Sequence, residues 1–233
     1  MSDVAEVPAY DDPATDPRRG VLWAGAAPVA AGDGRVGVGV GGGWVATWEG
    51  LVAVGAGMEL DLAWAPSRRF AVTAAGGSGV ARVLGDEVRG AGAVVSARYL
   101  LKDDGVARIA PFVAVAGEDT VLGDPVVVAG GGIAAEIPVY TVCFDVSLPL
   151  AGAVAVGELP DLPLTPGRFA PLFFLTEAGF TWHLGPSSSF RLGYLAAAST
   201  WSWRWHPGPL TLEMSAYTNL LTGNLSVRAG YAW

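Results

Sequence analysis

The chain contains only two histidines, His183 and His206, the side chains best suited to act as a general base near neutral pH. Neither lies in a recognisable catalytic motif. His183 follows Trp182 shortly before a predicted turn, where a structural position is the favoured interpretation. His206 lies in a turn-like stretch near Glu213 and is the better candidate for chemistry on lipid or peptide. We expect no catalytic residue, and a small enzyme acting near His206 is an alternative.

The sequence pattern does not predict a metal or cofactor site. Cys143 is the only cysteine, which excludes an internal disulfide and a thiolate metal cluster, and we expect it to be a small buried residue. The glycines between Gly37 and Gly43 are not followed by the Gly-Lys-Ser/Thr of a phosphate-binding loop. With a net charge of −8 and a single lysine, Lys102, the chain offers no basic surface for nucleic acid.

Charged residues recur at alternate positions of strand-like segments, on the side that otherwise carries glycine, alanine, serine and threonine. They are Glu59, Asp61, Arg98, Arg108, Glu136, Asp145, Glu177, Arg191 and Arg228. Charges of both signs can pair across a narrow interior, whereas a basic residue facing lipid costs roughly 2–4 kcal/mol at the membrane midplane. We predict that these residues fill a lumen and hold strand register, and a selective pore is the alternative.

The elements that position these charges are expected to be strands. The 233 residues are 52% hydrophobic and only 15% charged, against roughly 25% charged residues in an average soluble domain. No uncharged apolar run reaches the ~18 residues needed for a membrane-spanning helix. The 33 glycines and nine tryptophans favour strands instead.

Alternation with period two predicts an all-β, antiparallel up-and-down barrel of about ten strands. Four hairpins have short turns near residues 67, 103, 138 and 187, and residues 35–48 and 225–233 form single strands. An even number places both ends of the barrel on the same side. Twelve strands would result if residues 210–219 paired with a strand within 149–168, and eight if one hairpin were overcounted. Longer connections are expected at 85–90, 118–125, 149–171 and 204–224.

Aromatic residues decide which face of the barrel meets lipid. One set lies on the apolar face beside the short turns or the C-terminus: Trp64, Phe70, Tyr99, Tyr140, Trp182, Phe190, Tyr231 and Trp233. A second set is expected near the opposite strand ends: Trp44 and Trp48, with Trp201, Trp203 and Trp205. Two aromatic girdles are typical of membrane barrels. A soluble barrel with an apolar interior remains the non-membrane alternative.

The last nine residues, 225–233, alternate apolar residues and end on an aromatic one, Trp233. This segment resembles the C-terminal targeting strand of bacterial outer-membrane proteins, and the chain from Arg35 onward is similar in general pattern to small barrels of the OmpA, OmpX and OmpW type. Phenylalanine is commoner than tryptophan at the last position. The resemblance implies a location in the bacterial outer membrane, contact with its lipid and lipopolysaccharide, and recognition by the barrel-assembly machinery. It also implies that the short turns face the periplasm.

The chain divides into a flexible acidic tail at residues 1–33 and a transmembrane barrel at residues 34–233. Residues 1–16 are acidic and rich in proline and alanine, so no secretory signal is expected there. We expect a non-catalytic outer-membrane barrel, structural or surface-binding, with a lumen filled by paired charges. A narrow, porin-like diffusion channel and a small outer-membrane enzyme are the alternatives.

Overall fold

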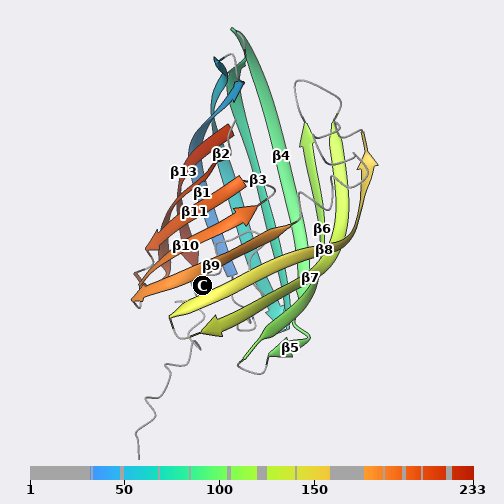
Figure 1. Ribbon diagram of the computed structural model, residues 1–233, viewed down its shortest axis with the longest axis vertical. Coiled ribbons are helices and arrows are strands. Elements are labelled where there is room, and N and C mark those ends of the chain that lie inside the picture. The colour runs from blue at the N-terminus through green and yellow to red at the C-terminus, as the bar shows by residue number, and fades with distance from the viewer. Residues whose placement is uncertain are drawn as a thin grey trace, which may run out of the picture.

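The computed structural model is a closed antiparallel β-barrel of twelve long strands and one two-residue strand (Figure 1). It describes residues 32, 34–47, 50–67, 69–83, 85–103, 106–119, 125–139, 141–157, 176–185, 187–195, 198–205, 207–218 and 222–233. The predicted all-β antiparallel barrel is confirmed. Among these residues, no helix is long and apolar enough to cross a membrane.

The barrel closes because its first and last strands pair with each other. The strands are β1 (Gly34–Thr47), β2 (Gly50–Ser67), β3 (Phe70–Val83), β4 (Asp86–Tyr99), β5 (Lys102–Asp103), β6 (Arg108–Asp119), β7 (Val126–Val139), β8 (Val142–Val156), β9 (Glu177–Gly185), β10 (Ser188–Leu195), β11 (Ala198–Trp205), β12 (Leu210–Thr218) and β13 (Thr222–Ala232). Neighbouring long strands pair in order, β4 pairs with β6, and β1 pairs with β13. The short β5 pairs only with the start of β6. The ring of twelve strands therefore has no open edge.

The first strand begins and the last strand finishes at the same end of the barrel, as predicted. Gly34 and Trp233 exchange two backbone hydrogen bonds, with N···O distances of 3.1 and 3.0 Å. The same end holds the turns after β2, β7, β9 and β11, and we call it the short-turn end. The opposite end is called the far end.

The barrel wall is taller on one side than on the other. Strands β1 to β4 have 14 to 18 residues, whereas β9 to β12 have only 8 or 9. With a rise of ~3.3 Å per residue and a tilt of ~40°, β2 spans about 45 Å along the barrel axis and β10 about 20 Å. Figure 1 shows this difference as a tall wall of β1–β4 and a low wall of β9–β12.

The predicted number of about ten strands is wrong, and the alternative of twelve is correct. The two additional strands are β11 and β12, which form a hairpin where the sequence analysis placed the end of one strand and a long connection at 204–224. The partner of β12 is therefore β11 and not a strand within 149–168. Each of these strands is only 8 or 9 residues long, and the turn between them contains Gly208 with a φ of 67°. A strand that short shows too few alternations to stand out from a loop.

Two other predicted connections are shorter in the structure. β4 begins at Asp86, so the predicted connection at 85–90 is mostly strand. β8 continues through Pro149 to Val156, which places the first part of the predicted 149–171 connection in the barrel wall. Pro149 lies opposite Gly132, where the register between β7 and β8 shifts. Because proline has no N–H to donate, a bulge is where a strand can accommodate it.

Side chains alternate between the two faces of the wall as the sequence predicts. Outward positions carry large apolar residues that stay exposed, such as Val38, Val40, Met58 and Leu60. Inward positions carry glycine, small residues and charges, and the buried apolar residues Phe112, Ala114 and Ala134 pack together on the inner side of β6 and β7. The polar and charged side chains therefore pack inside the lumen, and the apolar face points outward. A soluble barrel has the opposite arrangement, with its apolar face inside.

The charged lumen as candidate functional site

Twelve charged side chains on the inner faces of the strands form what we call the lumen network. Nine of them are the residues predicted from the sequence, and the other three are Arg35, Arg204 and Glu213. The network divides into two clusters of three arginines and three carboxylates each. The β13 cluster consists of Arg35, Glu59, Asp61, Arg204, Glu213 and Arg228. The β8 cluster consists of Arg98, Arg108, Glu136, Asp145, Glu177 and Arg191.

Arg228 on β13 is the centre of the β13 cluster. Its guanidinium contacts Glu59 at 2.7 Å and Asp61 at 3.2 Å, both on β2, and lies 3.6 Å from Glu213 on β12. Arg204 on β11 donates from Nε to Glu213 at 2.9 Å. Arg204, Glu213 and Arg228 are directly opposite one another in register, so their charges alternate across three neighbouring strands. Alternating charges in cross-strand positions stabilise the register of the sheet.

The contact between Arg228 and Glu59 spans a strand that lies between them. Gly39 of β1 is in register with both residues and has no side chain to separate them. A Cβ at this position would lie 2.6 Å from Glu59 Oε1, and one at Gly37 would overlap Asp61 Oδ1. The glycines of β1 therefore leave space on its inner side, and ion pairs occupy that space.

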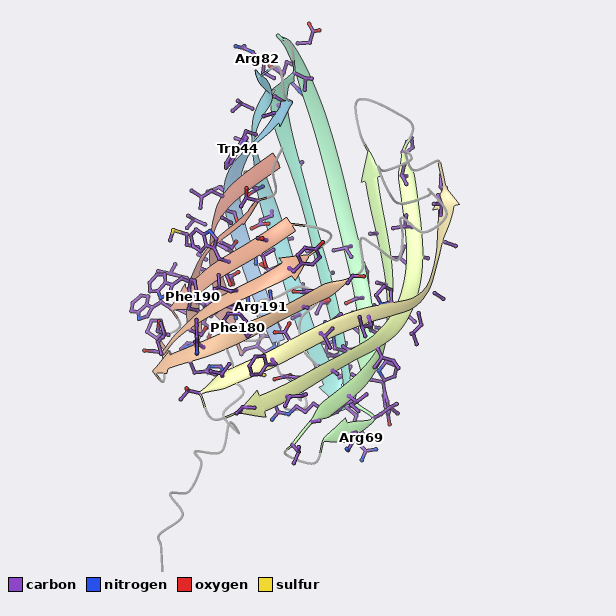
Figure 2. The ribbon with its side chains drawn as sticks, in the orientation of Figure 1. Trp44, Arg69, Arg82, Phe180, Phe190 and Arg191 are labelled. Atoms are coloured by element: carbon purple, nitrogen blue, oxygen red, sulfur yellow. The ribbon has the colours of Figure 1, made fainter. Side chains whose placement is uncertain are left out.

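The β8 cluster uses the same arrangement. Arg191 on β10 reaches across β9 to Asp145 on β8 at 2.6 Å, and it contacts Glu177 at 2.8 Å. Its guanidinium passes over Gly179, where a Cβ would lie 2.7 Å from Nη2. In Figure 2, Arg191 lies toward the inside of the low wall and the preceding residue, Phe190, lies toward its outside. An arginine that crosses a glycine to a carboxylate therefore occurs twice in the lumen.

The remaining members of the β8 cluster balance its charge. Glu136 and Asp145 are directly opposite each other on β7 and β8, which is unfavourable for two like charges. Arg108 lies 3.4 Å from Glu136 on the other side, and Cys143 donates from Sγ to the same carboxylate at 2.8 Å. Arg98 on β4 interacts electrostatically with Glu177 and Asp145 from across the lumen. Cys143 is buried, as predicted, and it also supports a carboxylate of the network.

Most side chains of the lumen network are buried. Nine of the twelve charged residues are buried, among them Arg35 and Glu177, each 2% exposed, and Glu136, which has no exposed surface. Side chains that line an open aqueous pore would be in contact with water. The arginines and carboxylates of the network are therefore packed against one another and shielded from water.

The sequence analysis missed three members of the network for identifiable reasons. Arg35 lies at the first residues of β1, next to the predicted tail. Arg204 and Glu213 lie in β11 and β12, in the segment interpreted as a connection. The sequence does contain a period-two pattern at both charges. Arg204 lies between the apolar residues Trp203 and Trp205, and Glu213 lies between large apolar neighbours. This alternation puts both charges on the inner face.

The structure places most of the predicted aromatic residues at the short-turn end, on the outward face. Phe70 is in register with Tyr99, Phe190 with Trp182, and Tyr231 with Leu210 at the start of β12. Trp64 and Trp233 are each about half exposed. Tyr140 and Trp48 lie outside the described residues. A ring of outward aromatics beside the turns is the arrangement that membrane interfaces favour.

The second predicted aromatic set is only partly at the far end. Trp44 is there, in register with Val54 and Gly223. Trp203 is in register with Phe190, and Trp205 with Ser188, so both belong to the short-turn end, contrary to the prediction. The prediction failed because β11 runs toward a short turn at 206–209 that was interpreted as part of a longer connection.

Of the two histidines, the structure describes only His183. His206 lies outside the described residues, and its described neighbours Trp205 and Pro207 are at the short-turn end. His183 is in register with Ser189, and its backbone N–H donates to the Thr141 carbonyl at 2.8 Å. No group of three or more His, Cys, Asp or Glu side chains among the described residues could hold a metal ion.

Comparison with known proteins identifies the fold. No family model and no curated protein sequence matches the chain. The KdgM porin, in a structure with disordered oligogalacturonate, aligns with 9% identity over 84% of this chain and 98% of its own, with a TM-score of 0.55. An outer-membrane channel from Pseudomonas putida F1 aligns with 10% identity over 91% of this chain and 98% of its own, also with a TM-score of 0.55.

Outer membrane phospholipase A from Escherichia coli aligns with 8% identity over 88% of this chain and 93% of its own, and its TM-score of 0.46 is too low to support an argument. The stronger matches establish that the chain has the fold of bacterial outer-membrane β-barrel proteins. The resemblance predicted from the sequence is confirmed at the level of the fold, and the predicted location in the bacterial outer membrane agrees with it.

Proposed function

We propose that the protein is a non-catalytic outer-membrane barrel, structural or surface-binding, whose lumen is kept closed by paired charges. The observation that carries the proposal is the burial of the lumen network, in which nine of twelve charged side chains are shielded from water. The ion pairs connect strands that are not neighbours, β13 with β2 and β10 with β8. Each of these contacts passes over the one strand between its partners, and the electrostatic interaction of Arg98 on β4 with Glu177 on β9 reaches across the interior.

Paired burial also explains why the network resists opening. Removing one partner of a buried ion pair leaves an uncompensated charge in a poorly solvated site, which costs about 3–5 kcal/mol. Opening a continuous aqueous path would require several of these pairs to separate together. Six arginines and six carboxylates balance one another, so the closed lumen carries no formal net charge.

Conductance measurements test the closed lumen. Wild-type protein reconstituted into planar bilayers is expected to show no stable unitary conductance. Arg228→Ala leaves Glu59, Asp61 and Glu213 opposed by only two arginines, and should produce cation-selective openings. Arg69→Ala, an exposed residue at the short-turn end, is the matched control and should behave as wild type. Stable wild-type conductance of the size of an open porin would refute the proposal.

A narrow diffusion channel is the second candidate, and one observation favours it. The inner face of the tall wall beyond Glu59 carries a row of glycines, Gly41, Gly57, Gly79 and Gly90, which adds no side chain to the lumen at that level. The matches with TM-scores of 0.55 are structures of a porin and of an outer-membrane channel. The same bilayer recordings separate the candidates, because a channel conducts without any substitution in the network.

A further inference from the structure

We infer that the lumen binds one small monovalent anion, of the size of chloride, between Arg35 of β1 and Arg204 of β11. The site lies on the short-turn side of the β13 cluster and includes the hydroxyl group of Thr211 on β12. The inference rests on the same buried packing as the proposed closed lumen, and it adds a ligand that this packing holds. Conductance tests the closed lumen and anion binding tests the site, so either proposal can fail without the other.

Arg35 has two donors that no described residue satisfies. The residue is 2% exposed, and its Nη2 lies 3.1 Å from Asp61 Oδ2. Its Nε and Nη1 are buried and have no hydrogen-bond partner in the described part of the chain. Asp61 is also shared, because Arg228 Nε lies 3.2 Å from its other carboxylate oxygen. A buried charged donor without a partner costs free energy, so a ligand that accepts hydrogen bonds from these two nitrogens is favoured.

The charges around Arg35 favour an anion over a water molecule. Among its charged neighbours, Arg204 interacts with it most strongly, and this interaction is repulsive. Five members of the β13 cluster are buried, namely its three arginines and the carboxylates of Asp61 and Glu213. The sixth member, Glu59, has a side chain that is 33% exposed, so water screens its charge. The buried part therefore carries one excess positive charge, which one monovalent anion balances.

Strand order brings the donors of the site together. β1, β13, β12 and β11 follow one another in the barrel wall (Figure 1). Arg35 extends from β1 over Gly230 of β13, where a Cβ would lie 3.3 Å from Arg35 Nε and 2.6 Å from Thr211 Oγ1. Arg204 lies on the following strand, opposite Glu213. Two guanidinium groups and one hydroxyl therefore lie near Gly230, and Arg35, Arg204 and Thr211 are each at most 9% exposed.

Burial limits the ligand to a small ion of one charge. An ion that enters must exchange its hydration shell for the guanidinium groups and the hydroxyl, and this exchange costs more for a divalent ion. A divalent anion would also leave the buried part of the cluster with an excess negative charge. The guanidinium group is more weakly hydrated than an ammonium group and suits a weakly hydrated partner. The site should therefore prefer chloride or bromide to sulfate.

Unfolding in the presence of chloride tests the site in solution. The full chain in lipid vesicles is titrated with urea while chloride replaces gluconate at constant pH and ionic strength. A chloride concentration about ten times the dissociation constant should lower the unfolding equilibrium constant of the wild type about tenfold. Sulfate at the same ionic strength should have a much smaller effect. Bromide should occupy the same site and give an anomalous diffraction peak beside Arg35 Nε, whereas a water molecule gives none.

Three variants separate the site from a general effect of salt. Thr211→Val removes the hydroxyl with little change in size and should weaken chloride binding about tenfold. Arg35→Gln removes the excess charge and the donors, and should lose the chloride dependence altogether. Arg108→Gln is the matched control, because it removes an arginine of the β8 cluster and should keep the wild-type affinity for chloride.

Three results would each overturn the anion site. They are equal chloride dependence in the wild type and Thr211→Val, stabilisation by sulfate as large as that by chloride, and bromide-soaked crystals without an anomalous peak beside Arg35. None of them changes the expected conductance of the wild type. An open wild-type pore would refute the closed lumen and leave a measured chloride affinity standing.

Discussion

The substitution Gly39→Ala tests whether the ion pair that crosses β1 depends on the missing side chain. The new Cβ would lie 2.6 Å from Glu59 Oε1 and 2.8 Å from Glu59 Cγ. The Glu59 side chain must then move away, and its 2.7 Å contact with Arg228 is lost. Arg228 keeps its contacts with Asp61 and Glu213.

Two opposing contributions decide the sign of the change in stability. Replacing glycine by alanine within a strand usually stabilises a protein by about 0.5–1 kcal/mol. A hydrogen bond between charged groups contributes about 1.5–3 kcal/mol. Because the Glu59 side chain is 33% exposed, solvent screening reduces this to about 1–2 kcal/mol. Gly39→Ala should therefore destabilise the barrel by about 0.5–1 kcal/mol, the opposite sign to an ordinary strand glycine.

A double-mutant cycle measures the effect directly. Urea titrations in lipid vesicles, followed by tryptophan fluorescence, would give the free energy of unfolding of Gly39→Ala alone and together with Glu59→Ala. In the Glu59→Ala background the same alanine should stabilise, giving a coupling of about 1–2 kcal/mol. Gly117→Ala is the control, since its Cβ would make only ordinary contacts at 3.5 and 3.7 Å. Stabilisation by Gly39→Ala in both backgrounds would refute the reasoning.

Three further changes test the assignment of the faces and the second cluster. Arg191→Leu leaves the carboxylates of Asp145 and Glu177 buried, and should lower the free energy of unfolding by about 3–5 kcal/mol in the same titration; a loss below 1 kcal/mol would contradict the buried pairing. Cys143 should react with a water-soluble maleimide far more slowly in the folded barrel than in urea, and equal rates would show that it is accessible. Val40→Arg, on the outward face of β1, should cost about 2–4 kcal/mol in vesicles, and a neutral result would place that face away from lipid.

The inner and outer faces of the barrel are predictable from the sequence because a strand has a period of exactly two residues. Once an apolar position is assigned to the outside, every second residue follows it. This is why the positions of Glu59, Asp145 and Arg228 on the inner face could be predicted. The aromatic residues beside the short turns follow from the same rule.

Which charges pair with one another could not be predicted from that alternation. Arg228 and Glu59 are 169 residues apart in the chain and meet only because β13 pairs with β1 when the barrel closes. That pairing depends on the number and stagger of all twelve strands, a property of the whole sheet. The short strands β11 and β12 made the number uncertain, and with it the place of Arg204 and Glu213.

The equal numbers of arginines and carboxylates link closure of the lumen to stability of the barrel. The formal charge of the chain is −8, yet the lumen network is neutral, so the excess negative charge lies outside it. A single charge removed from the network both unbalances the lumen and leaves a buried partner without compensation. Substitutions that open the lumen should therefore also destabilise the barrel, and conductance and unfolding should change together across a series of variants. A variant that conducts ions while keeping wild-type stability would show that something other than the ion pairs closes the lumen.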